Sequence, residues 1–179
     1  MRMRFRRRKK KPALWKGILA GAVGGAVGTF AMNYAHIAYA KVEKKVTGDE
    51  GNETDSSESE SAPVKAARKI AEPVIRRNLT KAEKELGGQV MHWVMGVGSG
   101  ATYGAIATSS PAVTMGAGLP FGAVLWALAD EIAVPAAGLS EPPTEVPVSV
   151  HTEALTSHLV YGLVTELVRD GVMKLLDSD

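Results

Sequence analysis

Two long intervals without a charged side chain constrain the fold of this chain more than any other feature. Residues 17–40 form 24 consecutive positions, and residues 86–129 form 44, with no Asp, Glu, Lys or Arg. Because about 20 apolar residues cross the hydrocarbon core of a bilayer, the first interval allows one crossing and the second allows two crossings and a turn. A helix at the surface of a soluble protein needs a polar face. The pattern therefore predicts an integral membrane protein.

We expect an all-α bundle of four transmembrane helices, followed by a short C-terminal tail. Ser109-Ser110-Pro111 separates the second span from the third, because proline lacks an amide donor and turns the chain. A loop rich in proline, 138–147, separates the third span from the fourth. The fourth span carries several ionisable residues, so part of it has to face protein or water. The expected spans are 13–40, 86–108, 112–137 and 148–168, the last three lying within 86–179.

The distribution of basic residues predicts the orientation. Nine Lys and Arg and no acid occupy the first sixteen residues, most of them in the segment 1–12. Positive residues next to a span stay in the cytoplasm, so both termini are expected there after four crossings. We expect the basic segment to contact anionic lipid headgroups rather than nucleic acid. A cleaved signal peptide is the competing interpretation, but the apolar run is long and contains Asn33 and His36, which favours an uncleaved helix.

The segment 41–85, expected outside, combines two kinds of sequence. Residues 47–62 are acidic and rich in serine, and such a composition predicts a disordered loop. Residues 63–85 place apolar side chains at helical spacing among basic ones, with an interruption near Pro73. This pattern is typical of a helix that lies on a membrane surface, and equally of a solvated linker helix.

Glycines recur at every fourth position in three of the expected spans. Without side chains at these positions, helices approach closely enough for backbone packing to hold them together in lipid. The rows are compatible with packing inside one chain, or with a glycine-lined homo-oligomer that forms a pore. The residues are Gly17, Gly21 and Gly25, the neighbouring Gly24 and Gly28, then Gly96, Gly100 and Gly104, and finally Gly118 and Gly122.

All four histidines fall in the outer half of the bilayer when the spans are laid antiparallel. Three carboxylates lie at similar depth, and such groups should face each other or a wet cavity. A hydrogen-bonded structural network, a proton sensor or relay, and a metal site remain as interpretations. No compact metal-ligand motif is present, so a metal is undecided. The candidate residues are His36, His92, Asp130, Glu131, His151, Glu153 and His158.

Several kinds of chemistry have no support in the sequence. The chain has no cysteine, which excludes disulfides, thiolate metal sites and cysteine nucleophiles. It also lacks a phosphate-binding loop, a G-x-S-x-G element and a glycine fingerprint between a strand and a helix. We therefore expect a protein without a cofactor and without enzymatic activity, and an intramembrane metal-dependent enzyme is the remaining alternative.

The order of these features resembles a known family. The stretch QVMHWVMGVGSGATYG is followed by GAGLPFGAVLWALADEIAVPAAGLS and then by SHLVYGLVTELVR. This is similar to the YagU-like proteins of the bacterial inner membrane. The resemblance implies a plasma-membrane location and a link to acid tolerance, and it transfers no catalytic residue. The expected function is a non-enzymatic role in acid or envelope stress homeostasis through the polar cluster, with a glycine-packed oligomeric channel or small transporter as the alternative.

Overall fold

A computed structural model describes residues 13–47 and 60–178, and these residues form an all-α fold without strands. This confirms the all-α part of the predicted fold class. The predicted basic segment 1–12 and most of the predicted acidic loop lie outside the described residues. The elements are α1 Leu14–Thr47, α2 Ala62–Ile75, α3 Lys81–Ser109, η1 Pro111–Thr114, α4 Leu119–Leu128, the π-helical turn η2 Ala129–Ala133, α5 Val134–Ala136, η3 Pro143–Glu145 and α6 Val148–Leu176.

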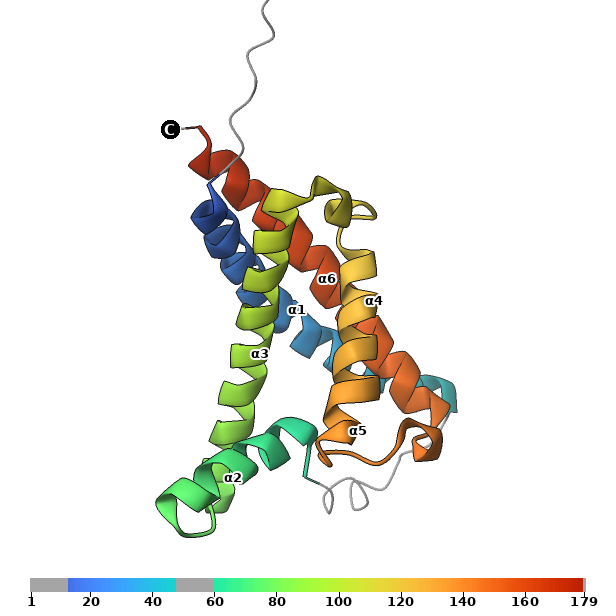
Figure 1. The fold of residues 1–179 in the computed structure, drawn as a ribbon. Helices are drawn as coiled ribbons and strands as arrows, with labels where there is room; N and C mark the ends of the chain where they lie inside the picture. Colours follow the sequence, from blue (N-terminus) through green and yellow to red (C-terminus); the bar gives the residue numbers. More distant parts are fainter. Residues whose placement is uncertain (1–12, 48–59, 179) are drawn as a thin grey trace, which may run out of the picture.

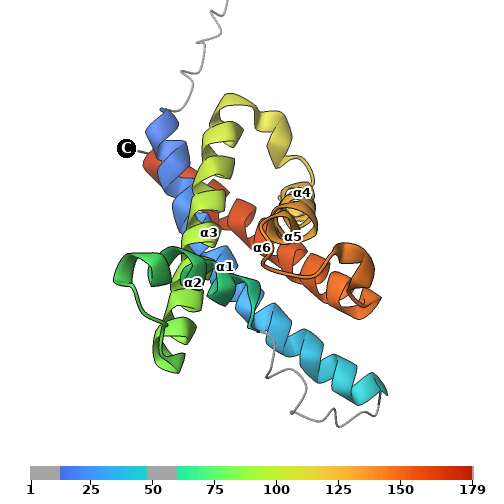
Figure 2. The ribbon, with the colours of Figure 1, turned by 60° about the horizontal axis from the view of Figure 1, so that its bottom comes forward.

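The long helices run in alternating directions, so that α1 begins where α6 ends (Figure 1). Lys16 Nζ lies 3.0 Å from Asp177 Oδ1 and ties these two ends together. Helix α1 packs against both α3 and α6, and α4 packs against α6. The short helix α2 crosses the far end of α3, away from the termini (Figure 2).

Glycines explain how closely α1 approaches its neighbours. A Cβ atom added to Gly25 would lie 2.5 Å from the carbonyl oxygen of Gly96, and one added to Gly17 would lie 2.6 Å from that of Gly104. On the next face of α1, a Cβ at Gly24 would lie 2.5 Å from the carbonyl oxygen of Thr165 in α6. Backbone therefore packs directly on backbone. The glycine rows face other helices of the same chain; Gly118 and Gly122 likewise lie against α6.

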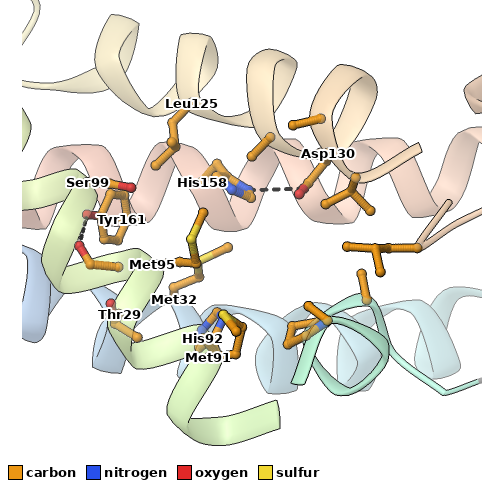
Figure 3. A pocket seen from close by; sticks show the side chains of 18 of the residues that line it. Thr29, Met32, Met91, His92, Met95, Ser99, Leu125, Asp130, His158 and Tyr161 are labelled. Carbon is orange, nitrogen blue, oxygen red and sulfur yellow. Dashed lines mark hydrogen bonds and ion pairs between the residues drawn. The ribbon is translucent and has the colours of Figure 1, made fainter. Parts of the chain in front are cut away.

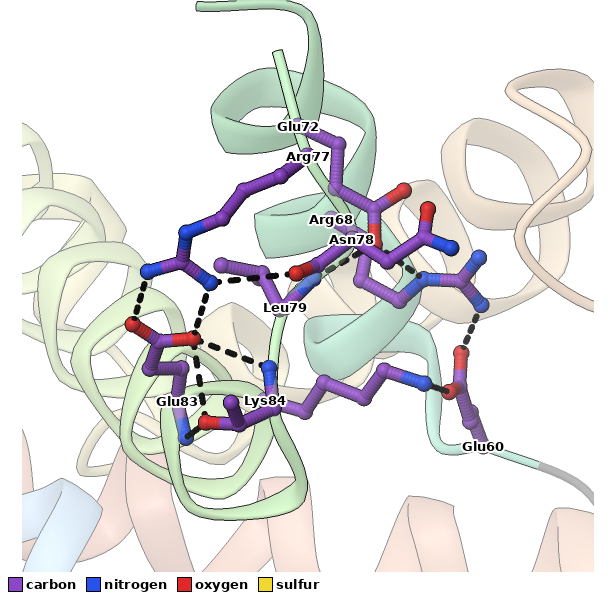
Figure 4. A network of polar contacts seen from close by, with 9 residues as sticks. Glu60, Arg68, Glu72, Arg77, Asn78, Leu79, Glu83 and Lys84 are labelled. Atoms are coloured by element: carbon purple, nitrogen blue, oxygen red, sulfur yellow. Dashed lines mark hydrogen bonds and ion pairs between the residues drawn. The ribbon is translucent and has the colours of Figure 1, made fainter. Parts of the chain in front are cut away.

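The junction of α2 and α3 is held by ion pairs (Figure 4). Glu60 pairs with Arg68 of α2 and, at 2.8 Å, with Lys84 of α3. Arg77 forms a two-pronged pair with Glu83, which also closes a capping box with Thr80. Val64 of α2 packs at Gly88, where a Cβ would come within 2.6 Å of its Cγ2.

Several predicted boundaries were wrong. Helix α1 continues past residue 40 to Thr47, because the residues beyond the apolar run include good helix formers. The predicted surface helix 63–85 is divided: α2 ends at Ile75, before Arg76 in the left-handed conformation, and the capping box starts α3 at Lys81 rather than 86.

The third and fourth predicted spans also have different limits. The helix expected from 112 begins at Leu119, since residues 111–118 form η1 and a turn with Gly116 and Gly118 at positive φ. The helix expected to end near 168 continues to Leu176.

Several polar side chains are buried between the helices, while many large apolar side chains are exposed. The buried polar side chains are Thr29, Ser157, His158, Thr165, Glu166 and Arg169. Exposed apolar side chains include Ile18, Val27 and Phe30 of α1 and Val94 of α3. Two described segments, Leu14–Val46 and Leu119–Ala136, are long and apolar enough to cross a membrane, and only 6% of the second is buried inside the molecule. A buried core helix would not be so exposed.

Candidate functional site: a histidine-lined cavity

A cavity of about 450 Å³ lies among α1, α3, α6 and the α4–η2–α5 segment, with the start of α2 at one end (Figure 3). Its walls are mainly apolar and include three methionines, Met32, Met91 and Met95. Three histidines and one carboxylate also line it. They are His36 of α1, His92 of α3, Asp130 of η2 and His158 of α6.

The π-helical turn η2 determines where the two adjacent carboxylates point. The amide of Val134 donates to the carbonyl of Ala129, five residues earlier, and Pro135 has no amide to donate. Such a turn inserts an extra residue into the helix, and π-turns are frequent at functional sites. Asp130 reaches His158 in the cavity, whereas Glu131 reaches His151 outside it.

His158 is the most buried of the histidines, with 8% of its surface exposed. Its Nδ1 lies 2.9 Å from the carbonyl oxygen of Ala154, so Nδ1 carries a proton and donates it. Asp130 Oδ2 lies 3.6 Å from the same nitrogen, which is within the range of an ion pair but too long for a hydrogen bond. In the neutral ring, Nε2 is left as a free acceptor.

His92 contributes a polar atom without a partner. Its Nε2 is buried and forms no hydrogen bond within the described part of the chain. A buried polar atom left unpaired costs about 1–3 kcal/mol, so such atoms call for a functional explanation. His92 lines the cavity on the α3 side, across from Asp130 and His158 (Figure 3).

The other predicted residues form separate pairs. His151 Nδ1 lies 2.6 Å from Glu131 Oε1, and its Nε2 donates to the carbonyl of Pro143 at 3.0 Å. His36 Nδ1 lies 3.3 Å from Glu153 Oε1 and 3.2 Å from Ser157 Oγ. The seven candidates thus divide into three pairs plus His92. Among the described residues, no three His, Asp or Glu side chains gather closely enough to hold a metal ion.

Sequence reasoning missed the rest of the cavity wall. Tyr161 of α6 donates to the carbonyl of Gly96 of α3 at 2.6 Å and so joins the two helices beside the cavity. Ser99 and the three methionines also line it. Their spacing looks like that of ordinary helix-packing residues, so no signal in the sequence distinguished them.

By its fold and its site, the chain is an all-α protein in which histidines and one carboxylate surround a cavity between helices. Residues 73–167 match DUF1440, a family described as protein of unknown function, and the match covers more than half of the 179 residues. The chain belongs to this family. The matched segment includes His92, Asp130 and His158, but not His36. No curated protein and no solved structure matches the chain significantly.

Proposed function

We propose that the chain is an integral membrane protein that crosses the bilayer four times, through α1, α3, α4–α5 and α6. The outward-facing apolar surface and the buried polar residues support this placement. Helix α6 contains Glu166 and Arg169, but both are less than 10% exposed and form two hydrogen bonds of 2.6 and 2.7 Å with each other. Ionisable residues in a membrane span are expected to pair inside the bundle in this way.

Helix α3 fits the same placement. Its polar and small residues reduce its hydropathy, but Gly96, Gly100 and Gly104 face α1 and do not meet lipid. Between residues 86 and 108, the large apolar side chains exposed on its surface include Val90, Val94 and Ile106, while Gln89 and Thr102 are exposed polar residues. Helix α1 begins and α6 ends at the same end of the bundle (Figure 1), and the basic residues before α1 support a cytoplasmic position for that end. The resemblance to YagU-like proteins supports the inner membrane of a bacterium, with lipid headgroups as neighbours.

The proposed role is non-enzymatic: the cavity responds to protons and so supports tolerance of acid or envelope stress. The contact between His158 and Asp130 carries this proposal. Histidine normally titrates near pH 6.5, and burial beside a carboxylate makes its charge state matter to packing. A proton gained or lost by the pair of Asp130 and His158 changes the attraction between η2 and α6. The shape of the cavity then depends on pH.

Survival of acid by cells that carry a variant as their only copy tests this role. The double variant Asp130→Asn/His158→Gln should reduce survival to the level of cells without the protein, at unchanged abundance in the membrane. The variant Glu131→Gln/His151→Gln removes a similar pair that does not line the cavity, and should retain survival. Normal survival of the first variant would contradict the proposed role.

The glycine rows favour a function within one chain over a glycine-lined oligomeric channel. Gly17, Gly21 and Gly25 already contact α3, and no second copy can use the same atoms. A homo-oligomer would have to form through other surfaces.

A further inference from the structure

The cavity has the size and composition of a site for a small molecule. Ligand sites are typically about 300–1,000 Å³, mainly apolar, with a few convergent polar groups. At one end, the rings of Tyr103 and Phe121 stack with centroids 4.2 Å apart and close the space between α3 and α4. At the other end, Pro63 and Ala66 of α2 line it.

The cavity opens between these two ends. Met95 of α3 and Ala133 of η2 line it and are also exposed at the surface. Helices α3 and α4 are joined by η1 and are apart along most of their length (Figure 1). Under the four-span placement, this opening faces the hydrocarbon of the bilayer. A ligand would therefore enter from the membrane.

Most polar atoms of the lining are already satisfied. Thr29 donates to the carbonyl of Gly25, Tyr161 donates to that of Gly96, and His36 contacts Glu153 and Ser157. The atoms left for a ligand include the carboxylate of Asp130, Nε2 of His158 and Nε2 of His92, and the hydroxyl of Ser99 and Nε2 of His36 also belong to lining residues.

Charge decides between ligand classes. Within the described ranges 13–47 and 60–178, Asp130 is the only carboxylate that lines the cavity. The titratable groups around it are His158 of α6, His36 of α1, His92 of α3 and its neighbour Glu131, while Lys69 of α2 donates to the carbonyl of Ala137 at 2.6 Å. Once the pair of Asp130 and His158 has released its proton and the histidines are neutral, the cavity carries a single negative charge in apolar surroundings. Anions are repelled, and a cation with an apolar body is attracted.

We propose that the cavity binds a monovalent hydrophobic cation from the membrane, in exchange for one proton. This inference rests on the proposed function and specifies the ligand of the same site. Before binding, the pair of Asp130 and His158 holds one proton. The cation takes the place of that proton as the counter-charge of Asp130, and the proton is released to water, so charge is conserved. The flexible thioethers of Met32, Met91 and Met95 accommodate apolar bodies of different shapes.

Binding of tetraphenylphosphonium to the purified full chain in phosphatidylcholine nanodiscs tests this inference. The probe has a fixed charge, so any dependence on pH comes from the protein. We expect saturable binding of one probe per chain, weakened tenfold for each pH unit of acidification where the pair holds its proton, as linkage to one proton requires. Asp130→Asn should abolish binding, whereas Glu131→Gln, which changes the adjacent carboxylate outside the cavity, should retain it.

A second variant distinguishes loss of the exchanged proton from loss of the folded structure. His158→Gln should still bind the probe but lose the tenfold dependence near neutral pH, because the proton that exchanges with the cation is gone. No saturable binding at pH 8, equal binding by Asp130→Asn, or equally tight binding of uncharged tetraphenylmethane would overturn the inference. If the probe does not bind but the double variant loses acid survival, this inference is wrong and the proposed function stands. If binding is linked to one proton but the double variant survives acid normally, this inference stands and the proposed function is wrong.

Discussion

At the scale of single residues, Glu83 shows how local chemistry holds an exposed junction. Its carboxylate accepts hydrogen bonds from Arg77 at 2.6 and 2.8 Å and from the amide of Thr80 at 2.9 Å. These bonds lower the pKa of Glu83 from its usual 4.5 to about 2, and the bond from Arg77 has the largest effect. Glu60 and Glu72 in the same network also have lowered pKa values, through Lys84 and through the amide of Leu79 respectively.

The lowered pKa of Glu83 predicts how the α2–α3 junction responds to acid. A carboxyl with a depressed folded-state pKa stabilises the fold above its unfolded pKa, and this contribution is lost as pH falls from about 4.5 to about 2. The protection of the amides that begin α3 against hydrogen exchange, measured relative to an unstructured peptide at the same pH, should therefore fall across this window. Glu83→Gln should show low protection already at pH 6, whereas Glu85→Gln, at an exposed position one residue beyond Lys84, should behave like the wild type. A protection factor independent of pH in the wild type would contradict the prediction.

At the scale of elements, the approach of α1 to α3 depends on the absence of side chains. A Cβ at Gly100 would lie 2.6 Å from Cα and 2.8 Å from the amide nitrogen of Gly25, both rigid backbone atoms. Gly98, two residues away on the same helix, has no atom within 4 Å of its Cβ position. The same helix therefore contains a required glycine and a dispensable one.

This difference predicts opposite effects of the same substitution. Gly100→Ala should force the helices apart and lower stability by about 1–3 kcal/mol, as overpacking does. Gly98→Ala should be neutral or stabilising by up to about 1 kcal/mol, because alanine favours the helix more than glycine does. Reversible unfolding of the two purified variants in detergent compares them directly. Equal stabilities would show that the helices do not meet as described.

At the scale of the whole molecule, the four crossings that we propose would place successive loops on opposite sides of a membrane. The chain contains no cysteine, so a single introduced thiol reports one position. Ser110→Cys, before η1, and Thr144→Cys, in η3, are both at exposed positions. In intact cells an impermeant maleimide should label position 144 and not position 110, and both should react after lysis. Labelling of both, or of neither, in intact cells would contradict the four-span arrangement.

The sequence alone determined the features that depend on local composition. Charge-free intervals predicted the all-α fold and the break at Pro111, because apolarity and the missing proline donor act within a few residues. It also indicated which glycines could allow close approach. It did not show where α2 ends or that α4 begins only at Leu119, because these limits depend on conformations such as that of Arg76 and of Gly118.

Only the tertiary structure decided which polar residues meet. Asp130 and Glu131 are neighbours in the chain, but the π-turn directs them to His158 and His151 respectively. The seven residues predicted as one cluster form three separate pairs plus His92, and three methionines complete the cavity wall. His36 and Glu153 are distant in the chain, and they meet because α1 packs against α6. That packing is a property of the assembled bundle and cannot be read from either segment alone.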